Sequence, residues 1–264
     1  MGFRLQFIGG GKMGEALLGG LIAQGWAPPE ELAVTETLAE RRRELSGRFP
    51  QTLVSDAPQA GVDAVLAVKP NDIEAAAGAL AALGPPRVLS IAAGVRTASL
   101  ERRLGAGTRV VRAMPNTPAL VGAGVSAVAP GSSATADDVG WAVDVLSSVG
   151  AVEVTSEQQL DAVTGLSGSG PAYVFLVAEA LIAAGVAEGL APEVADSLVR
   201  ATIRGAGELL VRADRPPAAL RADVTSPGGT TAEGIRVLEH EGVREALAAA
   251  VAAATRRSLE LGGS

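Results

Sequence analysis

Two glycine-rich segments, far apart in the chain, have residue types and spacings suited to holding a small anionic ligand. The first, Gly9-Gly10-Gly11-Lys12-Met13-Gly14, fits the pattern G-x-G-x-x-G. The second is Val224-Thr225-Ser226-Pro227-Gly228-Gly229-Thr230-Thr231, where proline and glycine permit a sharp turn before an amphipathic run, residues 232–240. Neither segment contains a carboxylate, a histidine or a cysteine. Both therefore indicate binding and positioning of a ligand, with little proton transfer by side chains.

The second segment is expected to open a helix. Thr230 and Thr231 lie at its start, where hydroxyl groups can cap backbone N–H groups that have no partner within the helix. Those N–H groups and the positive end of the helix dipole form a site for a carboxylate. Gly228 and Gly229 lack a Cβ atom, so a small ligand can approach the backbone closely. A plain capped helix after a loop is the alternative interpretation of these eight residues.

The first segment follows a short apolar run, Phe3–Ile8, and precedes a helical pattern, Glu15–Ile22. In a strand-turn-helix of this kind the glycines form a tight turn and let a pyrophosphate approach the backbone, and they allow the helix to pack closely on the strand. The residues expected to bind a dinucleotide here are Gly9, Gly11, Lys12, Met13 and Gly14. The alternative is a strand-turn-helix that binds nothing.

The sequence leaves the preferred dinucleotide open. Glu36 follows the expected second strand, Leu32–Thr35, and an acidic residue about 20 positions after the glycines can accept a hydrogen bond from a ribose hydroxyl, which favours NADH. Arg41, Arg42 and Arg43 come next and could instead bind the 2′-phosphate of NADPH. A solvated helix face is the alternative for at least two of these arginines.

Strand and helix patterns alternate along residues 1–157, which predicts a mainly parallel, doubly wound α/β domain of the Rossmann type. The expected strands are residues 3–8, 32–35, 52–54, 63–68, 87–91, 109–113, 125–129 and 151–154, with helices at 38–48, 72–83, 98–104 and 136–147. Lys69, Ala92, Ala93 and the loop Met114–Pro118 follow strand ends, where ligands bind in such sheets. Only helices are expected after this, so residues 158–264 should form an all-α second domain.

Composition excludes several classes of function. The 22 basic and 29 acidic residues give a net charge of −7, which argues against nucleic-acid binding. There is no cysteine and a single histidine, His240, which excludes thiolate chemistry and multi-histidine metal sites. The N-terminus lacks a signal-peptide pattern, and the longest apolar stretch, Ala172–Ala187, contains Glu179 and is shorter than the roughly 20 residues of a membrane span. We expect a soluble, cytoplasmic protein without membrane contacts.

The apolar stretch Ala172–Ala187 also bears on assembly. It is apolar on more than one face, and such a helix needs burial all round. A helical domain of this size has little interior of its own. We therefore expect this domain to pack against the same domain of another subunit, which gives a homodimer and allows a larger homo-oligomer.

The second glycine-rich segment and its surroundings resemble the C-terminal motif of the pyrroline-5-carboxylate reductase family. The resemblance runs over Leu220–Ile235 and continues at Leu238-Glu239. Further motifs of the family are similar to Ala67-Val68-Lys69-Pro70, Arg112–Pro118 and Asp161–Phe175, so the resemblance covers nearly the whole chain. It implies that the chain reduces 1-pyrroline-5-carboxylate, a cyclic imino acid, to L-proline by hydride transfer from NADPH or NADH to the C=N carbon.

The resemblance also implies roles for individual residues. The substrate-binding residues would be Gly228, Gly229, Thr230 and Thr231, with the backbone amides of the last three on the substrate carboxylate. The expected catalytic residues are Thr231, whose hydroxyl would lie near the ring nitrogen, and Ser226 as a supporting polar group. Around the cofactor, the resemblance implies roles for Val68, Lys69 and Pro70 near the ribose, for Ala92 and Ala93, and for Asn116 near the nicotinamide.

Two alternative functions make different demands on the sequence. A β-hydroxyacid dehydrogenase has a similar N-terminal plan and carries a catalytic lysine in the pattern G-x-x-G-x-G-x-x-x-K. Gly165, Gly168 and Gly170 have this spacing, but Val174 occupies the lysine position. A non-catalytic dinucleotide-binding sensor would not need the second anion site at residues 226–231.

Overall fold

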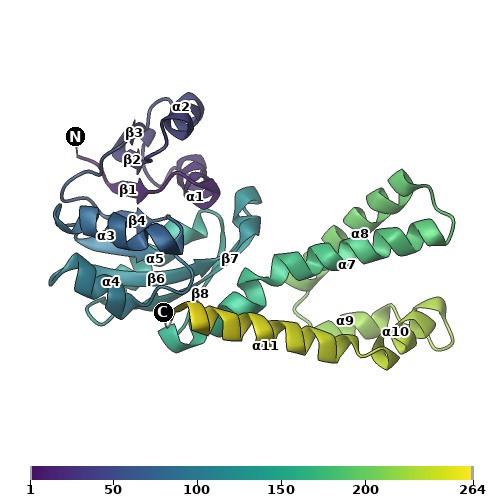
Figure 1. Cartoon of the computed structure of the whole chain (residues 1–264). Coiled ribbons are helices and arrows are strands. Elements are labelled where there is room, and N and C mark those ends of the chain that lie inside the picture. Colours follow the sequence, from purple (N-terminus) through teal and green to yellow (C-terminus); the bar gives the residue numbers. More distant parts are fainter. Residues whose placement is uncertain (1, 263–264) are drawn as a thin grey trace. The chain divides into compact units, whose positions relative to one another are not determined.

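The computed structural model describes residues 2–262, which divide into two compact units. We call residues 2–169 together with 252–262 the sheet unit, and residues 170–251 the helical unit. The sheet unit has alternating strands and helices, whereas the helical unit contains no strand among its described residues (Figure 1). The predicted fold class, an α/β dinucleotide-binding domain followed by an all-α domain, is confirmed.

Eight strands form one sheet in the order β3-β2-β1-β4-β5-β6-β7-β8. β6 and β7 are antiparallel, and every other neighbouring pair is parallel. The strands are β1 Leu5–Ile8, β2 Leu32–Thr35, β3 Leu53–Ser55, β4 Ala64–Leu66, β5 Arg87–Ser90, β6 Arg109–Pro115, β7 Gly124–Pro130 and β8 Gly150–Val154. The strand order reverses between β1 and β4, and ligands of such sheets bind at this reversal, beyond the carboxyl ends of the strands.

Helices cover both faces of the sheet (Figure 1). On one face α1 Lys12–Ala23, α2 Ala39–Arg48 and α5 Ala136–Ser147 contribute to the larger apolar core, which includes Trp141. On the other face α3 Ile73–Ala81 and α4 Thr97–Leu104 enclose a second core. All four residues of β1 and of β2 are buried, which explains their nearly continuous apolar sequence.

The division into compact units differs from the expected domain boundary at residue 157. After that residue the chain enters a 3-10 turn, Glu157–Gln159, then α6 Leu160–Val163 and a π-helical turn, Thr164–Gly168. Leu160 is fully buried and forms a small apolar cluster with two alanines of β7, and Asp161 is also buried. These side chains belong to the interior of the sheet unit, so the compact units separate after residue 169.

The turns after residue 157 continue into α7 Gly170–Ala187, which gives one helical run over residues 157–187. Among the described residues this is the one helix long and apolar enough to cross a membrane, judged by length and composition alone. The sequence-based expectation was limited to Ala172–Ala187 and therefore underestimated the length of the run. Core helices of soluble assemblies meet the same criterion, because an apolar helix can be covered by protein as well as by lipid.

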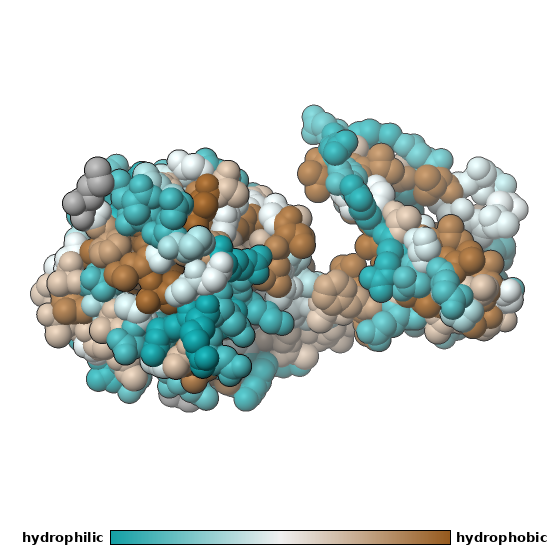
Figure 2. Space-filling model, turned by 90° about the horizontal axis from the view of Figure 1, so that it is seen from above, coloured by the Kyte–Doolittle hydropathy of each residue, from teal (hydrophilic) through white to brown (hydrophobic). Residues whose placement is uncertain are grey.

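The helical unit exposes much of its apolar side-chain surface in the single chain. It contains α7, α8 Pro192–Arg212, α9 Pro217–Asp223, α10 Thr230–His240 and the first part of α11 Val243–Gly262. Brown, hydrophobic residues are prominent on its surface in Figure 2. Exposed large apolar side chains of α7 and α8 include Phe175, Leu176, Leu181, Leu198 and Leu209. Extended apolar surface of this kind marks a site of interaction with another molecule.

Candidate active site

The glycine-rich turn after β1 has the close contacts that its pattern predicts. Gly9 has a φ of +106°, and a Cβ atom there would lie 2.7 Å from the carbonyl oxygen of Ala67. A Cβ atom on Gly14 would clash with the carbonyl oxygen of Gly9, so glycine at this position lets α1 pack directly on the turn. Gly9 and Gly14 are therefore required by the fold itself.

Gly11 has open space beside it, because no described atom lies within 4 Å of a Cβ atom placed there. Gly11 is the N-cap of α1 and provides no side chain to bond the first N–H groups of the helix. Those N–H groups have no partner inside the helix, and the helix dipole is positive at this end. Open space beside free donors fits the pyrophosphate of a dinucleotide. The exposed Lys12 and the half-buried Met13 begin the helix on this side.

Glu36 lies directly after β2, as predicted, and its carboxylate accepts hydrogen bonds from two backbone N–H groups. Oε2 accepts a hydrogen bond from the backbone N–H of Gly10 at 3.1 Å, and Oε1 accepts one from that of Leu38 at 2.9 Å. Glu36 thus ties the glycine-rich turn to the end of β2. Oε1 also accepts from the Thr37 hydroxyl at 3.4 Å, whereas Oε2 can accept a second hydrogen bond, so the side chain keeps acceptor capacity for a ribose hydroxyl.

The three arginines of α2 have different surroundings. Arg41 donates to the carbonyl oxygen of Gly10 at 2.8 Å. Arg42 donates to two backbone carbonyl oxygens between β2 and α2, both at 2.8 Å. Arg43 is exposed, and its guanidinium donates to a carbonyl oxygen of its own helix at 3.4 Å. The first two arginines therefore stabilise the turn and the end of β2, and Arg43 is the solvated one.

Glu15 is a residue of this region that the sequence analysis did not assign. It lies in the first turn of α1 and forms ion pairs with Arg41 and Arg48 of α2. Hydrogen bonds to Glu44 and Glu15 raise the pKa of Arg41 above its usual value. An acidic residue at the start of one helix and arginines in the next were visible in the sequence, but their pairing depends on how the two helices pack.

The loops after β4 and β5 lie at the carboxyl ends of neighbouring strands, as expected. Val68 is half-buried, and Lys69 is exposed and forms no ion pair with any described residue. Pro70 begins a short 3-10 turn. After β5, Ala92 is buried and Ala93 half-buried. Small side chains and a free cation at this edge suit a dinucleotide, and the assignments remain predictions.

Asn116 has a structural partner at each end of its side-chain amide. Its Oδ1 accepts a hydrogen bond from the backbone N–H of Val125 at 2.9 Å, and its Nδ2 donates to the carbonyl oxygen of Ser167 at 3.1 Å. The side chain is buried, with 8% of the residue exposed. Asn116 therefore joins the end of β6 to β7 and to the π-helical turn, and its predicted position near the nicotinamide stays a prediction.

The segment Ser226–Thr231 forms a turn followed by a helix, as predicted, but the helix is capped differently. Gly228 has a φ of +69°, and Gly229 is the N-cap of α10, with its N–H donating to the Ser226 carbonyl oxygen at 3.0 Å. The expectation that threonine hydroxyls cap this helix is wrong, because Thr230 and Thr231 are already its first two residues and no side-chain cap forms. Both threonines are exposed in the single chain, which leaves their hydroxyls and N–H groups available to a ligand.

An ion cluster flanks this loop within the helical unit. Glu239 near the end of α10 accepts hydrogen bonds from Arg244 of α11 at 2.6 and 2.7 Å and from Arg221 of α9 at 3.0 Å. Arg244 is the main cause that lowers the pKa of Glu239 to about 2, with Arg221 adding to it. The cluster connects the helices on both sides of residues 224–229. Glu239 belongs to the family motif, but its ion pairs could not be expected from its sequence neighbours.

Comparison with known proteins covers both units. The family described as pyrroline-5-carboxylate reductase dimerisation matches residues 157–261, and the family described as NADP oxidoreductase coenzyme F420-dependent matches residues 4–94. The pyrroline-5-carboxylate reductase of Mycobacterium leprae (strain TN) is 43% identical to this chain, over 98% of the chain and 96% of the relative.

Solved structures show the same similarity. A pyrroline-5-carboxylate reductase from Coxiella burnetii is similar with a TM-score of 0.91 and 36% identity, over 98% of both chains. The Plasmodium falciparum pyrroline carboxylate reductase with NADP bound has a TM-score of 0.84 and 31% identity, again over 98% of both. With the glycine-rich turn, the loop before α10 and these full-length matches in agreement, the chain belongs to the pyrroline-5-carboxylate reductase family.

Proposed function

We propose that this reductase binds NADPH or NADH at the turn of residues 9–14 and holds 1-pyrroline-5-carboxylate at the loop of residues 226–231. The reaction of the family is the reduction of this imino acid to L-proline. The observation that carries the assignment of residues is the loop itself, in which Gly229 caps α10 and the exposed Thr230 and Thr231 are its first residues. A helix start without a side-chain cap keeps its N–H groups for a ligand.

In the proposed mechanism the protein supplies position more than proton transfer. The substrate carboxylate accepts hydrogen bonds from the N–H groups of Thr230 and Thr231, where the helix dipole also favours negative charge. The N–H of Gly229 would be the third donor, and it would share its hydrogen bond to the Ser226 carbonyl oxygen with the carboxylate. When bound, the reduced nicotinamide supplies the hydride for the C=N carbon. Hydride transfer requires the two reacting carbons about 3–3.5 Å apart, which makes orientation the main demand on the enzyme.

The hydroxyl of Thr231 would orient the ring nitrogen of the substrate. A threonine hydroxyl is too weak an acid to protonate an imine by itself, so this group positions the ring and Ser226 supports it. An imine that arrives protonated needs no further acid, because addition of hydride then yields the neutral amine. This agrees with the composition of the loop, which has no carboxylate and no histidine.

The direct test is the loss of NADH or NADPH absorbance with and without 1-pyrroline-5-carboxylate. Substrate-dependent oxidation of either dinucleotide is expected. A folded protein that binds a dinucleotide and shows no oxidation would support the sensor instead. Reduction of NAD+ or NADP+ with a β-hydroxyacid as the substrate would support the dehydrogenase.

Glu36 is proposed to set the preference between the two dinucleotides. Replacing Glu36 by glutamine keeps the length of the side chain and removes its charge, which would otherwise repel a 2′-phosphate. We expect the ratio of kcat/KM for NADPH to that for NADH to rise roughly tenfold. Glu153→Gln serves as the matched control, since Glu153 is exposed on β8, the edge strand at the far end of the sheet from β2. An unchanged ratio in Glu36→Gln would remove Glu36 from the cofactor site.

The dimerisation family matched at residues 157–261 implies a homodimer. We propose that the exposed apolar side chains of α7 and α8 form its interface, because burial of apolar area drives stable association. Light scattering should give the mass of two chains or an even multiple. Leu176→Glu should shift the protein toward smaller species, whereas Leu38→Glu should not, although both leucines are 66% exposed in the single chain. A single-chain mass for the unmodified protein would contradict this interface.

A further inference from the structure

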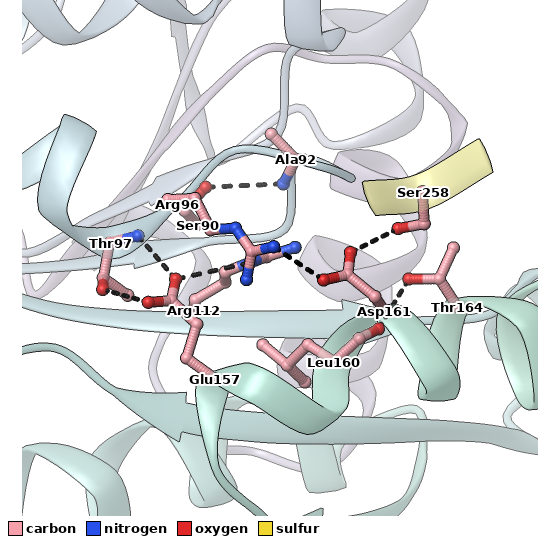
Figure 3. Close-up of polar contacts among 10 residues, drawn as sticks. All are labelled: Ser90, Ala92, Arg96, Thr97, Arg112, Glu157, Leu160, Asp161, Thr164 and Ser258. Atoms are coloured by element: carbon pink, nitrogen blue, oxygen red, sulfur yellow. Dashed lines mark hydrogen bonds and ion pairs between the residues drawn. The ribbon is translucent and has the colours of Figure 1, made fainter. Parts of the chain in front are cut away.

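The sheet unit contains a buried cluster of charged side chains that the proposed reaction does not use (Figure 3). Its members are Arg96, Arg112, Glu157 and Asp161. Arg112 is 1% exposed and Asp161 is 2% exposed. Burial lowers the pKa of the Arg112 guanidinium, and the hydrogen bond and charge of Glu157 act in the opposite direction. Charges are buried in proteins when they are paired, and this cluster holds two of each sign.

The two carboxylates hold the loop between β5 and α4 at its C-terminal end. Asp161 Oδ2 accepts a hydrogen bond from the Arg96 guanidinium at 2.8 Å. Glu157 accepts hydrogen bonds from the N–H and the hydroxyl of Thr97, the first residue of α4, at 2.7 and 2.9 Å. The other end of this loop, residues 92–93, is the part proposed to border the dinucleotide. The position of the proposed cofactor contacts is therefore tied to the buried cluster.

The end of α11 lies against the same loop. Ser258 is 4% exposed, and its hydroxyl donates to Asp161 Oδ1 at 2.7 Å (Figure 3). A Cβ atom on Gly94 would lie 3.4 Å from Leu261, and one on Gly262 would lie 2.7 Å from the carbonyl oxygen of Gly94. Asp161 thus binds the loop with one carboxylate oxygen and the C-terminal segment with the other.

We infer that Asp161 is a positioning residue that fixes the loop Ala92–Thr97 in the conformation that binds the dinucleotide, with Ser258 orienting its carboxylate. The inference rests on the proposed function, since it requires Ala92 and Ala93 to border the cofactor. The Arg96 side chain is 32% exposed, so without the Asp161 charge it can turn toward water and release the loop. A loop that is fixed before binding avoids the entropy cost of being ordered by its ligand.

The test compares Asp161→Asn and Ser258→Ala with the unmodified protein. Asp161→Asn keeps the shape of the side chain, and we expect the Kd for NADP+ and NAD+ in calorimetry to rise roughly tenfold. Ser258→Ala removes one hydrogen bond, and a rise of about threefold is expected. In the ligand-free protein, amide hydrogens of residues 92–100 should exchange faster in both variants. The KM for the imine should stay within about twofold.

Arg257→Ala is the matched control, because Arg257 precedes Ser258, is exposed and pairs with Glu260 of its own helix. It should leave both the Kd and the exchange of residues 92–100 unchanged. If Asp161→Asn does not fold, the Kd and the hydrogen exchange of Ser258→Ala alone test the inference. Folded variants with an unchanged Kd and unchanged exchange would overturn the inference. An unmodified protein that binds neither dinucleotide would instead contradict the proposed function, so the two failures are distinguishable.

Discussion

Replacing Gly11 by valine is expected to abolish dinucleotide binding while the protein stays folded. A Cβ atom on Gly11 would have no described atom within 4 Å apart from its chain neighbours, and the backbone angles of Gly11, φ −66° and ψ −179°, suit a β-branched residue. The added methyl groups would occupy the space proposed for the pyrophosphate, beside the first N–H groups of α1. We expect the Kd for NADP+ or NAD+ to rise by on the order of a hundredfold or more. The free energy of unfolding should fall by no more than about 1 kcal/mol, the cost of altering an N-cap.

Substitutions at two further glycines serve as controls for this result. Gly47→Val, near the end of α2, adds the same side chain where a Cβ atom would have no described atom outside its own helix within 4 Å, and binding should be unaffected. Gly14→Ala should instead destabilise the protein, because its Cβ atom would clash with the Gly9 carbonyl oxygen. Calorimetric titration and thermal unfolding of the three variants separate the two effects. Normal binding by Gly11→Val would show that the dinucleotide does not lie against this turn.

Replacing Thr231 by valine is expected to lower kcat/KM for the imine roughly a hundredfold, as is typical when one hydrogen-bond donor at a reacting centre is lost. Valine has the shape of threonine without the hydroxyl, so the N–H groups at the start of α10 and the fold of the loop should persist. The Kd for the dinucleotide should change by less than about twofold, because Thr231 is assigned to the substrate and not to the cofactor. Steady-state kinetics with varied imine, together with calorimetric titration of the dinucleotide, measure both quantities.

Thr225 offers a matched control in the same loop. Its hydroxyl already donates to the carbonyl oxygen of Arg221 at 2.6 Å, so Thr225→Val should cost stability and leave the chemistry largely unchanged. Thr231→Ser restores the hydroxyl and should recover most of the activity. Equal loss in Thr225→Val and Thr231→Val, or no recovery in Thr231→Ser, would show that the hydroxyl of Thr231 has no special role.

The order of the elements could be predicted from the sequence because it depends on local pattern. Apolar runs bounded by turn residues gave the strands, and the helix Ala136–Ser147 has the bounds that its pattern indicates. The place where the two compact units separate could not be predicted in this way. It depends on whether Leu160 and Asp161 are buried by the sheet unit, and their sequence neighbours do not reveal which part of the chain covers them.

The candidate site, too, could be predicted in part from the sequence and in part only from the tertiary structure. The spacing of Gly9, Gly11 and Gly14 indicated a dinucleotide turn, but it did not separate the two glycines that the packing requires from the one beside open space. The arginines of α2 were equal candidates for a phosphate until their partners were known. Arg41 and Arg42 bind backbone carbonyl oxygens, which leaves Arg43 solvated.

The sequence by itself determined the fold class, the family and the two segments proposed to bind the ligands, because these follow from patterns within short stretches of chain. The tertiary structure alone decided that Asn116 joins three segments through its amide and that Ser258 binds Asp161, a residue 97 positions earlier. Contacts over such separations depend on the packing of whole helices against the sheet. A local pattern of residues does not specify that packing, so the partners of Asn116 and Ser258 can be identified only in the folded chain.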